Sequence, residues 1–192
     1  IRANRFILMQ IAVYSGSFDP LHIGHLAVLA YLNARFDKVL LVVSPQNPFK
    51  GAEKAANATA RLSAAREAVE RHPELARVEV CDIEFQMSAP QYTFRTLDAL
   101  QALYPSDTLT LVIGGDNLSA FNRWRNYAQI LLQFGVLVYP REGFDSEAVK
   151  AALLKENKLY RIDIAQMPLV SVSSTEIREA KTHGDDVKKW LM

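Results

Sequence analysis

The chain has 192 residues, of which 49% are hydrophobic, and this is enough for one compact domain with a substantial core. Lys and Arg number 22 against 21 Asp and Glu, so the net charge of +1 excludes a charge-driven nucleic-acid or membrane-surface partner. Cys81 is the only cysteine, which excludes an intramolecular disulfide or a cysteine-based zinc cluster and favours a reducing, cytoplasmic location.

The fold is predicted to start at Met9, because Met9 and Gln10 directly precede the first apolar run. Residues 1–8 hold a short apolar patch without the cleavage pattern of a signal peptide, and we interpret them as an extension or an expression remnant. Residues 9–192 are then expected to form a single domain. No apolar run approaches the roughly 18 residues that a membrane span requires.

Strand-like and helix-like segments alternate along the chain. Short apolar runs rich in β-branched residues predict strands at residues 11–15, 38–44, 77–81, 108–113, 134–139 and 160–164. Segments with helical periodicity lie at residues 22–35, 58–71, 93–104, 124–132 and 146–156. This alternation is typical of an α/β fold, so we predict a Rossmann-like parallel sheet flanked by helices on both faces, with a small C-terminal helical segment.

Clusters of polar residues follow four of the predicted strands. They read GSFDP after the first, SPQNPFK after the second, GGDN after the fourth and SVSSTEIR after the last. Because ligands bind at the carboxyl ends of the strands in open parallel sheets, we expect these clusters to form one site. The irregular stretch 45–57 is long enough to be more typical of a functional loop than of a simple connection.

The first cluster is predicted to turn the chain from strand to helix. Gly16 and Ser17 leave the strand in a turn where a missing side chain lets a ligand approach the backbone. Asp19 and Pro20 then look like a capping side chain followed by proline at the first helical position. A helix N-terminus offers unpaired N–H groups and a partial positive charge, which favour a phosphate ligand.

Two histidines follow in the segment LHIGH. His22 and His25 are three residues apart and share one face of the predicted helix, and Gly24 between them leaves room for a bulky ligand. Imidazolium groups there can stabilise the charge that grows on phosphate during nucleotidyl transfer. The alternatives are half-buried surface histidines, or a metal site completed by Asp19. Neither the GxxxxGK[ST] phosphate loop nor the GxGxxG dinucleotide pattern occurs here.

Two later clusters offer further ligand-binding groups. Gly114 allows close approach of a ligand, and Asp116 supplies a carboxylate for ribose hydroxyls, although Asp116 could instead cap the next helix. Ser173 and Glu176 have the spacing of a capping box, which predicts a helix whose N-terminus can bind phosphates. Arg178 on that helix would present a fork of donors to an anion, or would be an ordinary solvated arginine.

The segments GSFDPLHIGH and SSTEIR resemble the nucleotidyltransferase signature that contains HxGH and its late partner segment. The intermediate segments SPQNPFK, YTFRTL and LVIGGDNLSAFNRW are similar to those of bacterial nicotinate-nucleotide adenylyltransferases, in the same order, from Ile11 to about Arg178. The resemblance implies transfer of AMP from ATP to nicotinate mononucleotide, giving deamido-NAD and pyrophosphate in NAD biosynthesis.

The resemblance also implies a role for individual residues. The phosphate of the mononucleotide would attack the α-phosphorus of ATP, with Mg²⁺ bound mainly through the ATP phosphates and no metal ligands from the protein. The expected partners are ATP and nicotinate mononucleotide, without nucleic acid or membrane, and a homo-oligomer is compatible with the sequence. The implied residues are catalytic His22, His25 and Arg178; ATP-binding Gly16, Ser17, Phe18, Gly24, Lys50, Gly114, Asp116, Ser173, Ser174 and Thr175; and, for the nicotinate nucleotide, Tyr92, Thr93 and Trp124.

Two residues depart from the pattern of the family. Phe49 stands where a histidine is expected before Lys50, and Arg95 stands where an aspartate is usual. Trp124 is the expected stacking surface for the pyridine ring, with a core position as the alternative. Other acceptors remain open: nicotinamide mononucleotide, phosphopantetheine, or glycerol phosphate with CTP. A nucleotide-binding sensor that has lost turnover is the alternative from a different class.

Overall fold

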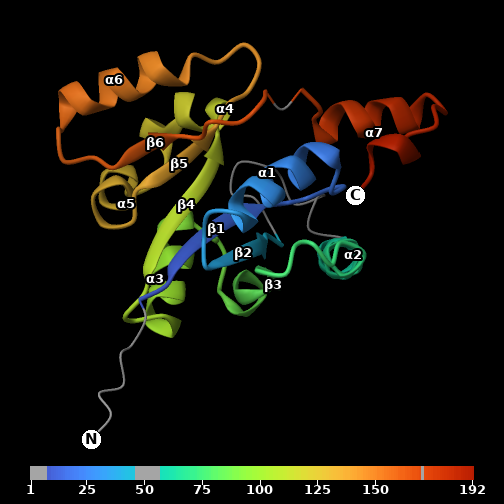
Figure 1. Cartoon of the computed structure of the whole chain (residues 1–192), viewed down its shortest axis with the longest axis horizontal. Coiled ribbons are helices and arrows are strands. Elements are labelled where there is room, and N and C mark those ends of the chain that lie inside the picture. Colours follow the sequence, from blue (N-terminus) through green and yellow to red (C-terminus); the bar gives the residue numbers. More distant parts are fainter. Residues whose placement is uncertain (1–7, 46–56, 170) are drawn as a thin grey trace, which may run out of the picture.

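The computed structural model describes residues 8–45, 57–169 and 171–192, and strands and helices alternate in it as the sequence predicts (Figure 1). The strands are β1 (Gln10–Gly16), β2 (Lys38–Val43), β3 (Val78–Cys81), β4 (Thr108–Gly114), β5 (Val136–Tyr139) and β6 (Ile162–Ile164). The α-helices are α1 (Ile23–Asn33), α2 (Ala58–Glu70), α3 (Thr93–Leu103), α4 (Gly115–Ser119), α5 (Tyr127–Gln133), α6 (Ser146–Glu156) and α7 (Ser174–Thr182). The short 3₁₀ helices are η2 (Ile83–Gln86), η3 (Phe121–Arg123) and η4 (Lys188–Trp190).

The strands form one parallel sheet in the order β3-β2-β1-β4-β5-β6. Chain order therefore reverses between β1 and β4, which are neighbours with Tyr14 opposite Val112. The connections after these two strands leave in opposite directions, and a crevice opens between them at the carboxyl edge. The predicted Rossmann-like parallel sheet is confirmed, and this edge is the place to look for a ligand site.

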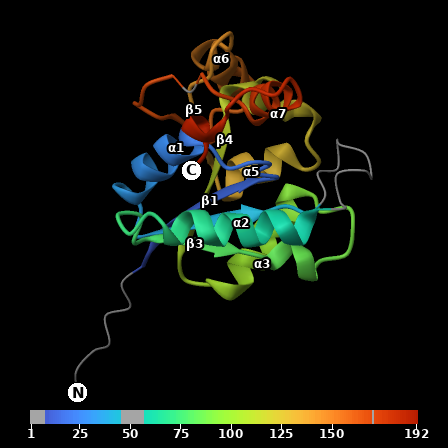
Figure 2. The same cartoon turned by 90° about the vertical axis from the view of Figure 1, so that its right-hand side faces the viewer.

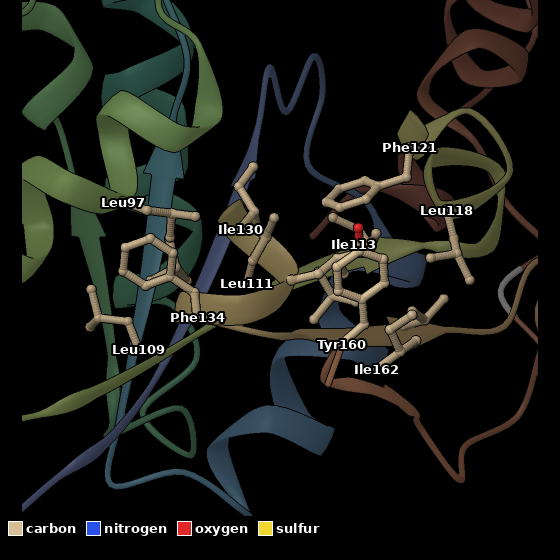
Figure 3. Packing of buried hydrophobic residues seen from close by; sticks show 14 of the residues in the cluster. Leu97, Leu109, Leu111, Ile113, Leu118, Phe121, Ile130, Phe134, Tyr160 and Ile162 are labelled. Atoms are coloured by element: carbon tan, nitrogen blue, oxygen red, sulfur yellow. The ribbon is translucent and has the colours of Figure 1, made fainter. Parts of the chain in front are cut away.

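Apolar side chains cover both faces of the sheet, because successive residues of a buried strand point to opposite sides. On one face Val13 and Leu111 pack with residues of α3, α4, α5 and α6, and Figure 3 shows this cluster around Leu111, Ile130 and Phe134. On the other face Ala12 and Tyr14 pack with α1 and α2. In Figure 1 the strands lie between α2 and α3, and in Figure 2 α2 lies in front of the strands. The helices thus flank both faces, as predicted.

The C-terminal segment folds back onto the carboxyl edge of the sheet. In Figure 1 α7 and the chain end lie beside α1. Leu191 forms an isolated antiparallel bridge with His22, and a guanidinium N–H of Arg71 donates to the carbonyl oxygen of Met192 (2.9 Å). The first and last segments of the described chain therefore meet beside β1.

Two predicted helix starts need correction. The first helix begins at Ile23 and not at His22, and the helix expected from Trp124 begins at Tyr127. Cys81 lies on β3 and is half-buried, and burial raises its pKa. None of the helices in residues 8–45, 57–169 and 171–192 is long and apolar enough to cross a membrane.

Candidate active site

A pocket of about 350 Å³ opens at the carboxyl edge of the sheet, where β1 and β4 diverge. Residues of all four polar clusters that the sequence placed after strands line it, the second cluster through Ser44. The lining residues that the sequence analysis singled out are Gly16, Ser17, Phe18, His25, Tyr92, Thr93, Gly114, Asp116, Trp124, Ser174, Thr175 and Arg178.

Four predicted site residues are not among the lining residues. His22 and Gly24 are buried beneath the pocket, where they hold the first turn of α1. Ser173 caps α7 and does not line the pocket. Lys50 lies outside the described residues, as does Phe49.

The turn after β1 starts the helix in a different way from the one predicted. Asp19 was expected to cap the helix and Pro20 to open it, but both precede the N-cap, which is His22. The ring of His22 accepts a hydrogen bond from the backbone of Gly24, and His25 closes a reciprocal capping box. Imidazole nitrogens thus take the place of the carboxylate as acceptors for the free N–H groups of the first turn.

This capping fixes the protonation of the histidine pair. Backbone N–H groups donate to Nδ1 of His25 (3.2 Å) and to Nδ1 of His22 (3.1 Å), so each neutral ring carries its proton on Nε2. The ring centroids lie 3.7 Å apart, which disfavours two positive charges. Burial lowers the pKa of His22 to about 4 and that of His25 well below 6.5, with Arg141 adding to both shifts. The expected imidazolium is therefore replaced by neutral imidazole.

The lowered pKa of His22 predicts acid-sensitive folding. Above pH 6.5 His22 is neutral in both the folded and the unfolded chain, so its protonation does not affect the free energy of unfolding. Between pH 6.5 and about 4 only the unfolded chain takes up the proton, so the free energy of unfolding falls as the pH falls through this window. Protonation of His22 is expected to lower the free energy of unfolding by at most about 3 kcal/mol, and urea unfolding at several pH values tests this.

A variant with a different capping acceptor is the control for this prediction. His22→Asn supplies a side-chain oxygen that caps a helix and does not titrate. Its free energy of unfolding should vary less with pH between 6.5 and 5 than that of the unaltered chain. Equal slopes in the two proteins would contradict the assignment to His22.

The N-terminus of α7 closes the pocket from the far end of the chain. The predicted capping box is present, since Ser173 Oγ accepts from the backbone of Glu176 (3.2 Å) and the Glu176 carboxylate accepts from the backbone of Ser173 (2.8 Å). A guanidinium N–H of Arg178 donates to the carbonyl oxygen of Asp19 (2.5 Å), and Ser174 Oγ donates to that of Pro20 (3.1 Å). The loop after β1 and the start of α7 are thereby held together.

The end of β4 brings a carboxylate to the pocket. Asp116 lies in the first turn of α4 but is not its N-cap, so the capping alternative is not realised. Its buried Oδ1 has no hydrogen-bond partner among the described residues, and Arg141 Nε lies 3.9 Å away. A Cβ at position 114 would lie 2.4 Å from this oxygen, which explains the glycine there.

Aromatic and basic side chains line another part of the pocket. Trp124 packs on Phe121 with ring centroids 4.9 Å apart, as the core interpretation predicts, and it also lines the pocket, so stacking on a pyridine ring stays a prediction. Arg125 lies over the ring of Tyr92, 5.3 Å from its centroid. Arg95 donates to the carbonyl oxygens of Ser88 (3.1 Å) and Pro90 (3.0 Å), which ties the preceding turn to α3.

Several pocket residues were missed by the sequence analysis. Arg61 does not line the pocket but is buried beside it, where it donates to the carbonyl oxygens of Ser17 (2.5 Å), Ser44 (2.9 Å) and Pro45 (3.0 Å) and so links the ends of β1 and β2. The position of Arg61 in the helical pattern of α2 did not indicate these contacts with the strand ends. The missed lining residues with polar side chains are Tyr14, Ser15, Ser44, Glu84, Gln91, Asn117, Arg125 and Tyr139.

The pocket combines donors suited to an anion with two acidic side chains. Neutral N–H donors come from His25 and from the helix N-termini, and the guanidinium groups of Arg125 and Arg178 add positive charge opposite the carboxyl groups of Glu84 and Asp116. Within residues 8–45, 57–169 and 171–192, no group of three or more His, Cys, Asp or Glu side chains could hold a metal ion. The arrangement can bind a polyphosphate and stabilise charge that develops on it.

The chain belongs to the cytidylyltransferase-like family, whose sequence profile matches residues 13–180, and a parallel sheet with a polar pocket at its switch point agrees with this class of nucleotidyltransferase. Within this family, a protein of Bacteroides fragilis named "Probable nicotinate-nucleotide adenylyltransferase" is 39% identical over 93% of this chain and 85% of its own. A protein of Flavobacterium psychrophilum with the same name is 36% identical over 89% and 86%. The resemblance predicted from the sequence is confirmed.

A solved structure supports the fold. The nicotinic acid mononucleotide adenylyltransferase of Plasmodium falciparum, complexed with NaAD, superposes with a TM-score of 0.78 over 95% of this chain and 90% of its own. The two sequences are 19% identical, so the likeness concerns the fold.

Proposed function

We propose that the protein transfers AMP from Mg²⁺·ATP to nicotinate mononucleotide, releasing pyrophosphate and forming deamido-NAD. The observation that carries the proposal is that one pocket brings together two kinds of lining side chain. His25, Ser174, Thr175 and Arg178 supply donors for a polyphosphate, whereas Trp124 and Arg125 supply an aromatic surface and a cation. The curated relatives that match most of the chain carry the corresponding name.

The polyphosphate side suits the transfer of an adenylyl group. The acceptor phosphate is an anionic nucleophile at neutral pH, so the reaction needs orientation and charge stabilisation more than a base. Nε2–H of His25 would donate to an oxygen of the α-phosphate, where charge grows as the acceptor attacks. Arg178 and the N-terminus of α7 would hold the departing pyrophosphate. His22 would act through its contacts with His25 and the first turn of α1.

The remaining predicted site residues are likewise divided between ATP and the nicotinate nucleotide. Asp116, with its unpartnered Oδ1, would accept hydrogen bonds from the ribose of ATP, and Gly16, Ser17 and Phe18 form the adjoining wall. Tyr92 and Thr93 would offer the N-terminus of α3 to the nicotinate carboxylate. Mg²⁺ would enter with ATP, bound mainly by its phosphates. A single cysteine and these substrates fit a cytoplasmic enzyme.

The cation beside Tyr92 predicts a preference for nicotinate over nicotinamide. The guanidinium of Arg125 attracts a carboxylate and gains little from a neutral amide, so kcat/KM with nicotinate mononucleotide should exceed that with nicotinamide mononucleotide. Arg125→Gln should lower the ratio of the two values about tenfold, mainly through KM for the nicotinate compound. Pyrophosphate release with ATP and each acceptor measures both ratios.

Arg123→Gln, which removes a nearby charge outside the pocket, is the matched control and should leave the ratio unchanged. A strong preference for nicotinamide mononucleotide would overturn the deamido assignment. If the protein binds ATP but releases no pyrophosphate from it in the presence of any of the four acceptors considered above, the nucleotide-binding sensor is favoured.

A further inference from the structure

Two buried side chains in the pocket present oxygen atoms that have no partner. Glu84 on η2 is 2% exposed and Gln91, just before α3, is 9% exposed, and both line the pocket. Oε2 of Glu84 and Oε1 of Gln91 have no well-aligned hydrogen-bond partner among the described residues. Burial raises the pKa of the Glu84 carboxyl, and the neighbouring hydroxyls of Ser44, Thr96 and Ser15 oppose that shift. A buried acceptor left unpaired costs about 1–3 kcal/mol, so two of them in one pocket point to a ligand group that donates.

The other polar atom of each side chain is already engaged, which sets its orientation. Thr96 Oγ1 donates to Oε1 of Glu84 (2.8 Å), leaving Oε2 for another donor. Nε2 of Gln91 donates to the carbonyl oxygen of Met87 (3.2 Å), leaving Oε1. Because both contacts are made within the protein, the two acceptors are positioned before a ligand arrives.

The kind of ligand group follows from the chemistry of these atoms. A carboxylate oxygen and an amide oxygen both accept, and the carboxylate repels phosphate and nicotinate groups. The matching group is therefore a neutral O–H donor, and a nucleotide carries two neighbouring ones on its ribose. The hydroxyls of Ser15 and Ser44, 3.3 Å apart on the same pocket wall, can rotate to complete such a network.

The acceptor nucleotide is the better source of these hydroxyls than ATP. Gln91 directly precedes Tyr92 and Thr93, whereas Asp116 presents its own unpartnered oxygen at the end of β4. We propose that Glu84 and Gln91 bind the ribose hydroxyls of the acceptor mononucleotide. This inference rests on the proposed function, which supplies that acceptor.

Deoxyribose analogues of the acceptor test this proposal. With the unaltered enzyme, kcat/KM for 2′-deoxy- or 3′-deoxy-nicotinate mononucleotide should be about 10- to 100-fold lower than for nicotinate mononucleotide. Gln91→Met and Glu84→Gln should lower kcat/KM for nicotinate mononucleotide and change that for the deoxy analogues much less. The ratio of the two kcat/KM values should therefore be smaller in the variants than in the unaltered enzyme. Glu84→Gln retains the oxygen that Thr96 contacts, which protects the fold.

Matched controls separate this effect from general damage. Gln101→Met makes the same change on α3 away from the pocket, and should retain full discrimination. The same variants assayed with 2′-deoxy- and 3′-deoxy-ATP should discriminate against them as the unaltered enzyme does. Thermal unfolding of each variant checks that it is folded.

The outcomes distinguish this inference from the proposed function. If kcat/KM of the unaltered enzyme is the same for the deoxy acceptors and for nicotinate mononucleotide, the ribose assignment is wrong although AMP transfer stands. The same holds if the variants lose discrimination only toward deoxy-ATP. If nicotinate mononucleotide accepts no AMP from the unaltered enzyme, the proposed function fails, and the assignment to its ribose fails with it.

Discussion

Replacing His25 by alanine should lower kcat for pyrophosphate release about 10²- to 10³-fold while the fold stays intact. The backbone N–H of His22 occupies Nδ1 of His25, so the only proton that the neutral ring can donate lies on Nε2. Alanine removes that donor where charge grows on the α-phosphate. Steady-state kinetics with ATP and nicotinate mononucleotide measure the loss.

Two comparisons make this result specific. His72→Ala removes a ring outside the pocket and should leave kcat unchanged. His25→Gln restores an N–H donor of similar reach and should recover part of the rate. Because the pKa of His25 is lowered, kcat should stay level between pH 6 and 8 as far as this residue is concerned. Near-normal turnover by His25→Ala would overturn the role given to it.

Replacing Arg178 by alanine should lower kcat by a similar factor, about 10²- to 10³-fold. Arg178 lines the pocket and also donates to the carbonyl oxygen of Asp19 and to Thr175 Oγ1 (3.0 Å). The variant therefore loses both a charge for the leaving pyrophosphate and a contact between α7 and the loop after β1. The KM for ATP should rise as well.

Graded variants separate these two losses. Arg178→Lys keeps the charge without the fork of donors, and should have a rate between those of the unaltered enzyme and the alanine variant. Lys181→Ala removes an exposed charge from the same helix and should change neither kcat nor KM. Added guanidinium ion should raise the rate of Arg178→Ala if the charge matters most. An alanine variant with an unchanged rate would remove Arg178 from the reaction.

Much of the fold follows from patterns that are local in the sequence. Buried parallel strands read as continuous apolar runs, so β1 and β4 could be located to within a residue or two. The capping box at Ser173 could be predicted because its two partners are three residues apart. The histidine pair could be predicted because spacing alone brings the two rings together.

The remaining errors arise where distant parts of the chain decide the local structure. Asp19 and Pro20 obey the local rules for a helix start, but their carbonyl oxygens bind Ser174 and Arg178, more than 150 residues away. Arg61 looks like a solvated helix residue until the ends of β1 and β2 are placed beside it. Glu84 lies in a segment without periodicity, and its burial depends on Thr96 and the strand ends.

The contacts of α7 with the loop after β1 also link the order of folding to substrate binding. They join residues 154 and 159 positions apart, so the phosphate side of the pocket is complete only after almost the whole chain has been made and has folded. Detachment of α7 is then a local unfolding step that removes part of the ATP site without dissolving the sheet. Bound ATP opposes that step by mass action, and the amide protons of α7 should exchange more slowly in its presence.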